Sequence, residues 1–205
     1  MQKVTKLLLF LLMLPLAFAS AASNKKVSEK RMSAYLMVFH RDDTHSLYMA
    51  LSRDGYHFTA LNNARPVISG DTIAEQRGVR DPHIYRGPDG AFYLVATDLH
   101  IYAQREGKRE TEWERDGETY GWGNNRGLVL MKSRDLIHWT HTVVNINEMS
   151  PELADIGCAW APETIFDEKT GRLMIYFTMR HKNGPNKLYY VYANNDFNRI
   201  ETTPK

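Results

Sequence analysis

Two acidic residues next to prolines are the strongest candidates for chemistry in this chain. Asp81 precedes Pro82 at the start of an aromatic-rich apolar run, and Glu163 follows Pro162 at the start of a similar run. A carboxylate at the start of a strand can accept a proton from water or hold a hydroxyl group. The alternatives are an aspartate that shapes a turn before proline, for Asp81, and a purely structural residue, for Glu163.

Two further side chains near these carboxylates could line a binding pocket. His83 stands two residues after Asp81, so a regular strand would turn both toward the same face. Trp160 stands three residues before Glu163, and an aromatic ring offers a face for the C–H surface of a sugar. We therefore count His83, Trp160 and Glu163 as candidates for substrate binding.

A long insertion, residues 99–127, supplies the remaining candidates. It carries Trp122, Asn124 and Asn125 within a glycine-rich stretch. Insertions of this length in compact folds are often functional, and an aromatic ring with nearby amides suits a sugar. The equally good alternative is a surface loop whose tryptophans pack beneath it.

Other kinds of site are not indicated by the sequence. The eight histidines show no helical H-x-x-x-H spacing, so no metal site is predicted. No G-x-S-x-G elbow marks a serine nucleophile, and the glycines at 121–127 lack phosphate-binding spacing. We expect no cofactor, although an axial cation of unknown position stays open.

A repeated turn indicates the elements that must position these residues. Ser52-Arg-Asp-Gly-Tyr-His-Phe58 recurs as Ser133-Arg-Asp-Leu-Ile-His-Trp139. A weaker third copy ends at Ile200 and keeps only Asp196 and the flanking apolar pattern. Each copy predicts a strand, a polar turn and another strand.

A hairpin precedes the second and third copies, which makes the full repeat a four-stranded unit. The pattern is typical of β-propeller blades and gives about two and three-quarter blades, with units at residues 34–62, 81–142 and 161–202. The first unit has only the second half of the hairpin, and residues 202–205 are expected to link to a further strand. The alternative is a two-sheet sandwich.

Composition agrees with an all-β fold and excludes some partners. Eleven Tyr, eight Phe and four Trp lie in short runs broken by Gly, Asn and Asp, which favours strands and turns. The lone Cys158 cannot form an internal disulfide. Charges of both signs are interspersed, which argues against nucleic acid and anionic membranes as partners.

The first residues are typical of a secretory signal peptide. Lys3 and Lys6 precede an apolar run that ends in small residues near position 21, and the run is too short for a membrane anchor. We predict a signal peptide at 1–21, a linker at 22–33, and a periplasmic or extracellular protein with no membrane attachment. Cleavage removes two of the 26 Lys and Arg and no acidic residue, so the mature chain has no formal net charge.

Motif order gives a resemblance to a known family. Arg80-Asp-Pro-His-Ile84, Ala159-Trp-Ala-Pro-Glu163 and the repeated turns together resemble glycoside hydrolase family 43 over nearly all of the chain after residue 33. Members of that family are five-bladed propellers that bind sugars at the axis and cleave glycosidic bonds with inversion. The resemblance implies a carbohydrate substrate containing arabinose, xylose or galactose. Because propellers close with about four to eight blades, we expect a longer chain to supply the missing blades, with a second chain as the alternative.

The resemblance also assigns roles to the carboxylates. Asp81 matches the family's general base, which deprotonates the attacking water. The family's general acid stands in a Glu-Gly-Pro or Glu-Ala-Pro order, whereas Glu163 follows Ala-Pro. Glu163 is therefore expected to line the pocket, and no residue here matches the acid or the third carboxylate. The 205-residue chain alone is expected to be inactive.

Two other functions remain open from the sequence. A propeller that has lost two catalytic carboxylates could bind carbohydrate without cleaving it. Ser52-Arg-Asp-Gly-Tyr-His-Phe58 also resembles the Asp-box of sialidases. In that box the glycine does not follow the aspartate directly, as Gly55 does here, and the neutral charge gives little sign of the required arginine cluster.

Overall fold

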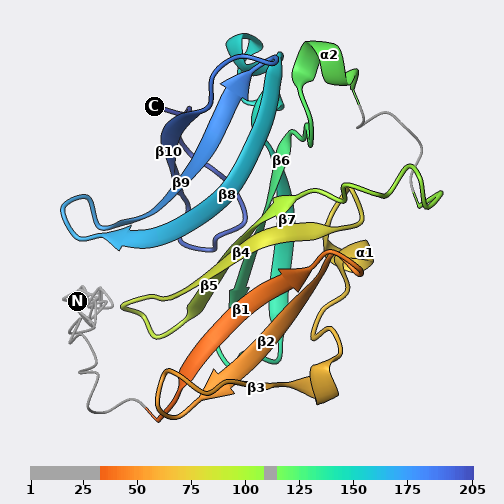
Figure 1. Cartoon of the computed structure of the whole chain (residues 1–205). Helices are drawn as coiled ribbons and strands as arrows, with labels where there is room; N and C mark the ends of the chain where they lie inside the picture. Colours follow the sequence, from red (N-terminus) through yellow and green to blue (C-terminus); the bar gives the residue numbers. More distant parts are fainter. Residues whose placement is uncertain (1–32, 109–114) are drawn as a thin grey trace, which may run out of the picture.

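The computed structural model describes residues 33–108 and 115–205, and this part of the chain is all β, as predicted (Figure 1). The predicted signal peptide and nearly all of the predicted linker lie outside the described residues. Three antiparallel sheets follow one another along the chain. The strands are β1 Tyr35–Arg41, β2 Ser46–Ser52 and β3 Thr59–Ala60 in the first sheet, β4 Val79–Arg86, β5 Phe92–Asp98, β6 Gly127–Ser133 and β7 Trp139–Asn145 in the second, and β8 Ile156–Asp167, β9 Arg172–His181 and β10 Lys187–Ala193 in the third.

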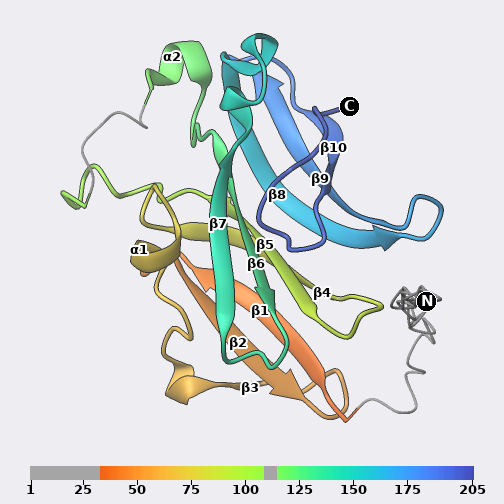
Figure 2. The ribbon, with the colours of Figure 1, turned by 180° about the vertical axis from the view of Figure 1, so that it is seen from behind.

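Short helical segments occur only in the connections of the described chain. They are η2 Asn62–Ala64, α1 Gly70–Ile73, α2 Gly117–Tyr120, η4 Ile146–Glu148 and η5 Pro151–Leu153. No helix among residues 33–108 and 115–205 is long and apolar enough to span a membrane. The view from behind shows the second sheet between the other two (Figure 2).

The two matching turns have the same hydrogen bonds, which confirms the repeat. Asp54 Oδ1 accepts from the amides of Tyr56 and His57 at 2.8 Å each. Asp135 Oδ1 accepts from the two equivalent amides at 2.9 and 2.8 Å. These bonds hold the pKa of both carboxyls well below the usual value, together with a bond from the histidine of each turn. These hydrogen bonds explain why both turns have an aspartate at this position.

The third turn corrects the expectation for Asp196. Here it is Asn194 Oδ1 that accepts the amides of Asn198 and Arg199, at 3.0 and 3.1 Å. Ala193 bridges Ile200, whereas Ser133 pairs with Trp139, so the third turn is one residue longer. In this longer turn the side chain that accepts the backbone amides is that of Asn194, the first residue after β10, and not that of Asp196.

The last residues do not form the link that was expected. Tyr190 N donates to Lys205 O at 3.0 Å, Lys205 N donates back to Tyr190 O at 3.1 Å, and Glu201 N donates to Tyr192 O. Residues 200–205 therefore run along β10, in the position that β7 has beside β6. They supply most of the missing fourth strand of the third sheet.

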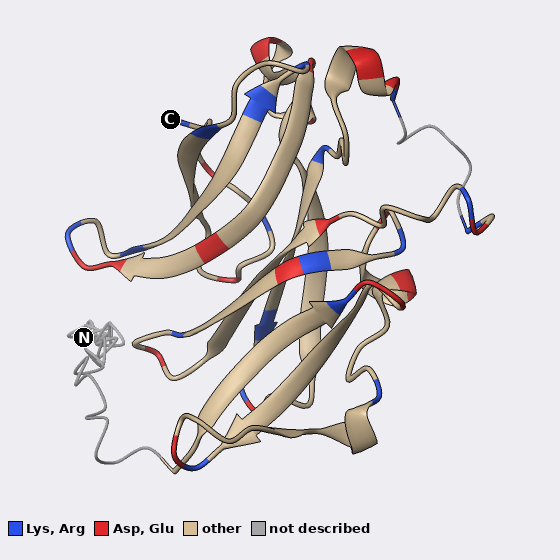
Figure 3. Cartoon of the chain, viewed as in Figure 1, with Lys and Arg blue, Asp and Glu red and all other residues tan. Residues whose placement is uncertain are grey.

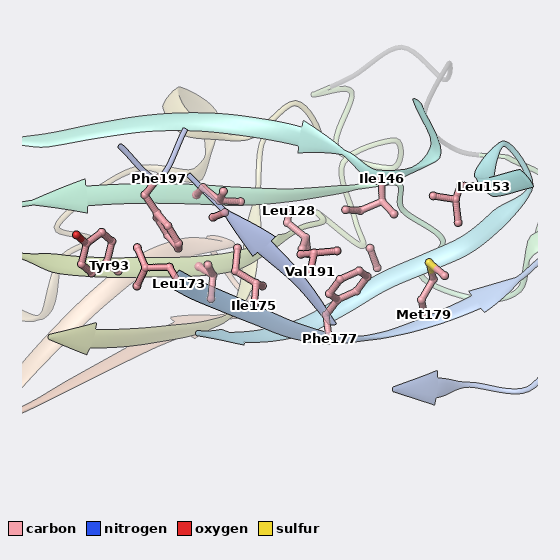
Figure 4. Packing of buried hydrophobic residues seen from close by; sticks show 14 of the residues in the cluster. Tyr93, Leu128, Ile146, Leu153, Leu173, Ile175, Phe177, Met179, Val191 and Phe197 are labelled. Atoms are coloured by element: carbon pink, nitrogen blue, oxygen red, sulfur yellow. The ribbon is translucent and has the colours of Figure 1, made fainter. Parts of the chain in front are cut away.

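Two apolar layers hold the three sheets together, so the fold is a series of blades and not a two-sheet sandwich. One layer lies between the first and second sheets and includes Leu47, Val79 and Leu94. The other lies between the second and third sheets; Figure 4 shows Tyr93, Leu128, Ile175 and other members of it. Because the second sheet packs on both faces, β5 and β6 are buried along nearly their whole length.

The outer faces of the first and third sheets expose apolar side chains. Tyr35 and Met37 of β1 are about 40% exposed, and Leu188 of β10 is 72% exposed. Acidic and basic residues are distributed over all three sheets and gather on no single one (Figure 3). The first and third sheets therefore each expose apolar side chains on the face that does not pack against the second sheet.

Candidate active site

Matching bulges interrupt β4 and β8, the first strands of the second and third sheets along the chain, which we call the innermost strands. In β4 the pairing register shifts between Arg80 and His83, and in β8 it shifts between Trp160 and Glu163. The residue before proline has a left-handed backbone in both places, with φ 47° at Asp81 and φ 44° at Ala161. Such bulges are frequent next to active sites because they redirect a side chain.

The bulge removes the basis of the argument that placed His83 beside Asp81. Arg80 lies opposite Thr97 and His83 lies opposite Val95, so the extra residue breaks the strict alternation of a regular strand. The Arg80 guanidinium donates to Asp42, in the turn between β1 and β2, at 2.6 Å, and His83 Nδ1 accepts from Thr164 N of the third sheet at 3.3 Å. Two-residue spacing is therefore not an argument for a shared face here, and the position of His83 beside Asp81 stays a prediction.

Asp81 has hydrogen bonds to the first sheet and within the second sheet, and is linked to the third sheet through Thr97. Its backbone amide donates to His40 Nδ1 of β1 at 3.1 Å. Its carboxylate accepts from the Thr97 hydroxyl of β5 at 3.2 Å, and that hydroxyl accepts from Ala161 N of β8 at 2.9 Å. A half-buried carboxylate with a fixed direction is suited to act as a general base.

His40 and Thr97 occupy equivalent positions in their sheets. Tyr35 pairs with Ser52 and Phe92 pairs with Ser133, at the start of the repeated turn in each sheet. Counting along each strand from these pairs brings His40 and Thr97 into register. In both cases a side chain of one sheet accepts the amide of the bulge residue in the next sheet.

Glu163 is placed on the exposed side of β8 and is bound by Tyr176. The two residues pair across β8 and β9, and the Tyr176 hydroxyl donates to Glu163 Oε2. This bond, with some burial, raises the pKa of Tyr176. Burial lowers the pKa of nearby His83, while the negative charge of Glu163 acts in the opposite direction.

A pair of tryptophans lies beside the bulge of β8. Trp122 is 69% exposed, and its ring meets Trp160 edge to face with the centroids 6.1 Å apart. Trp160 Nε1 donates to Gly123 O at 3.0 Å. The Arg180 guanidinium lies 4.4 Å from the Trp160 ring centroid and donates to the carbonyls of Tyr120 and Trp122. These contacts attach the described C-terminal part of the insertion to the third sheet, and the Trp122 side chain stays largely exposed to solvent.

Asn124 and Asn125 use their amide groups within the protein. Asn125 is buried, donates to the carbonyls of Asp98, Gly127 and Ala159, and accepts from Ala159 N at 2.8 Å. Asn124 exchanges bonds with the backbone of Arg115 at 3.2 and 2.9 Å. These contacts favour a structural role for both residues over the substrate contact predicted from the sequence.

A buried histidine pair lies next to Arg80, the residue that precedes Asp81. His45 and His100 stack with ring centroids 3.9 Å apart and planes 9° from parallel. His45 is fully buried, its Nε2 accepts from Ile101 N at 3.3 Å, and its Nδ1 has no hydrogen-bond partner among residues 33–108 and 115–205. Burial, followed by the charges of His100 and Arg80, lowers the pKa of His45 to about 4.

This shift predicts a loss of stability in mild acid. The folded pKa of His45 lies below the unfolded value of 6.5, so only the unfolded chain binds the proton as the pH falls between these values. The free energy of unfolding should drop by about 2 to 3 kcal/mol between pH 7 and pH 4 from this residue alone. Urea titrations of the protein and of His45→Asn at both pH values measure the difference.

Asparagine is chosen because it tolerates the left-handed backbone of His45, φ 46°. The variant is expected to be less stable at pH 7, since stacking is lost, but to show the smaller decline toward pH 4. An equal decline in both proteins would contradict the assignment.

Neither a metal cluster nor a reactive thiol is evident in the described chain. No group of three or more His, Cys, Asp or Glu residues within 33–108 and 115–205 is arranged to hold a metal ion. Cys158 is buried, and burial raises the pKa of its thiol to about 11, so the thiolate needed for nucleophilic attack is scarce at neutral pH.

His40, Thr97 and Ala161 were not identified from the sequence. Thr97 and Thr178 each stand seven residues after the turn glycine of their hairpin, Gly90 and Gly171, and this repeated hydroxyl was the available signal. His40 fills the same register position with a different side chain, so only the strand pairing reveals the equivalence.

Comparison with known proteins identifies the family of the chain. A family model described as a probable glycosyl hydrolase domain matches residues 30–205. An alpha-L-arabinofuranosidase of Bifidobacterium longum subsp. longum is 27% identical over 129 residues, which cover 62% of this chain and 11% of that protein. The chain thus spans about a tenth of the length of this curated relative.

One solved structure supports the fold, and a second match is more distant. The crystal structure of an alpha-L-arabinofuranosidase from Lactobacillus brevis matches 84% of this chain and 49% of its own, with 12% identity and a TM-score of 0.55. An exo-beta-1,3-galactanase from Clostridium thermocellum matches 58% of this chain and 22% of its own, with 14% identity and a TM-score of 0.38. The chain covers half or less of both structures.

Proposed function

Because the chain belongs to the family of probable glycosyl hydrolase domains related to glycoside hydrolase family 43, we propose that it forms part of an inverting glycosidase. The substrate class is a polysaccharide or oligosaccharide containing arabinose, xylose or galactose. The observation that carries the proposal is Asp81, a carboxylate at a left-handed bulge of an innermost strand, held by side chains from two other strands.

Asp81 acts as the general base in this proposal. It takes a proton from a water molecule as the oxygen of that water attacks the anomeric carbon, on the face opposite the leaving group. The bond from Thr97 fixes the carboxylate, and the bond from the Asp81 amide to His40 fixes its backbone, before substrate arrives, which lowers the cost of reaching the transition state. Trp122, beside Trp160 at the rim, offers its exposed face to a sugar ring.

The general acid comes from sheets beyond this chain. An inverting enzyme needs its acid about 6.5–9.5 Å from the base. The residue of β8 that occupies the position of Asp81 is Ala161, and Glu163 is bound by Tyr176. The exposed apolar faces of the first and third sheets are where further blades would pack.

A panel of nitrophenyl glycosides tests the function. The full natural protein is expected to release nitrophenol from at least one arabinofuranoside, xyloside or galactoside, and the 205-residue chain alone from none. Absorbance of nitrophenol measures release. Hydrolysis by the 205-residue chain that Glu163→Gln abolishes would overturn the assignment of Glu163 to the pocket wall.

The alternative function is carbohydrate binding without cleavage, which Ala161 at the position of Asp81 favours. If the full natural protein cleaves no glycoside of the panel but binds arabinan, xylan or galactan, this alternative holds and the glycosidase proposal fails. Export to the periplasm or the exterior, with no cofactor, completes the proposal and follows from the N-terminal pattern and the motifs.

A further inference from the structure

The Thr97 hydroxyl lies between two sheets and has a defined direction. Thr97 is fully buried, on β5 of the second sheet. Its oxygen accepts from Ala161 N at 2.9 Å and lies 3.2 Å from Asp81 Oδ2. A hydroxyl has one proton, and because the Ala161 amide occupies a lone pair, the proton is directed to the carboxylate.

The amide that directs this proton depends on a strained backbone. Ala161 has φ 44°, a left-handed conformation that is unfavourable for a residue with a Cβ atom. In β8 the pairing register shifts at this residue, so its amide leaves the ladder within the third sheet. Because of the bulge, the Ala161 amide donates to the Thr97 hydroxyl. The backbone of the third sheet thereby orients a side chain of the second sheet.

We propose that Thr97 is a positioning residue for the reaction, which holds the Asp81 carboxylate in the direction from which it takes a proton from water. This rests on the proposed function, in which Asp81 is the general base. The His40 contact to the Asp81 amide fixes the backbone of the same residue from the first sheet. The base is thus positioned by Thr97 of its own sheet, together with contacts from the first sheet to Asp81 and from the third sheet to Thr97.

Kinetics of Thr97→Val in the full natural protein test this proposal. Valine keeps the shape and removes the hydroxyl, so the carboxylate loses its fixed direction while the sugar contacts remain. We expect kcat to fall about 10- to 100-fold, with KM within about threefold of the unaltered protein. Thr97→Ser restores the hydroxyl and should return kcat to within about threefold.

Ser46→Ala is the matched control. The Ser46 hydroxyl is also buried, accepts an amide, from Gly70 at 3.2 Å, and donates to the Thr44 carbonyl at 3.1 Å. It has the same two kinds of bond but does not touch Asp81. A general cost of losing such a hydroxyl would lower the melting temperature of both variants, whereas only Thr97→Val should lower kcat.

Three outcomes overturn the proposal. An unchanged kcat in Thr97→Val, when Asp81→Asn is inactive, rejects the role of Thr97 and leaves the base in place. An equal loss in Thr97→Ser and Thr97→Val shows that the methyl group matters and the hydroxyl does not. Full activity in Asp81→Asn rejects the proposed base, and Thr97 with it. Should Thr97→Val not fold, Thr97→Cys, which has only a weak donor, is expected to show the same fall in kcat.

Discussion

Asp81→Asn is expected to lower the kcat of the full natural protein by about 10²- to 10⁴-fold, the range that general base catalysis contributes. Asparagine is the informative replacement because it also tolerates the left-handed backbone at this position, φ 47°. Its side-chain oxygen can still accept from Thr97, so the bulge remains and only the basic group is lost. Hydrolysis of the best nitrophenyl glycoside, with KM determined alongside, measures the effect.

Asp196→Asn provides the control for Asp81→Asn. Asp196 is an exposed carboxylate in the third turn, where Asn194 is the acceptor of the turn amides. The same change of charge there should leave kcat within about twofold, because exposed carboxylates away from a site contribute little. Unchanged turnover in Asp81→Asn would remove the general base from the proposed mechanism.

Asn125→Ala is expected to lower the free energy of unfolding by about 3 kcal/mol. The side-chain amide of Asn125 joins β5, β6 and β8, through the carbonyls of Asp98, Gly127 and Ala159 and the amide of Ala159. Alanine leaves these buried groups without partners, and each unsatisfied group has its own desolvation cost. Urea denaturation followed by circular dichroism measures the change.

The same variant separates the two interpretations of Asn125. A residue that contacts substrate would raise KM with little change in stability, whereas a clamp between strands lowers stability first. Asn195→Ala, at an exposed position of the third turn, is the control and should change the free energy of unfolding by about 0.5 kcal/mol or less. A destabilisation of Asn125→Ala no larger than that of the control would contradict the clamp.

The sequence predicted the sheets because the signal was repeated. The Ser-Arg-Asp turns before Phe58 and Trp139 recur in the structure with the same hydrogen bonds, and the family resemblance is confirmed by the match over residues 30–205. The three-stranded first sheet, without a counterpart of β4 among the described residues, also agrees with the missing half hairpin. Repetition made these predictions secure, since each copy tests the others.

The site was less predictable because it depends on departures from regular geometry. Alternation along a strand placed His83 with Asp81, but the bulge after Arg80 inserts a residue and breaks the period. Amide side chains near Trp122 suggested sugar contacts, yet burial turned Asn125 into a structural clamp. Composition and spacing contain no information on which polar group is buried, and burial decides the role.

The contact from Ala161 to Thr97 has a consequence for protein engineering. Propeller sheets look like interchangeable modules, and exchanging one for a homologue is an obvious route to new specificity. In this protein an exchange of the third sheet would also replace the amide that directs the Thr97 proton toward Asp81. In a chimera that loses the bulge before Pro162, the carboxylate of the proposed base would lose its fixed direction, even if new sugars bind. The bulge should therefore be transferred together with the specificity loops.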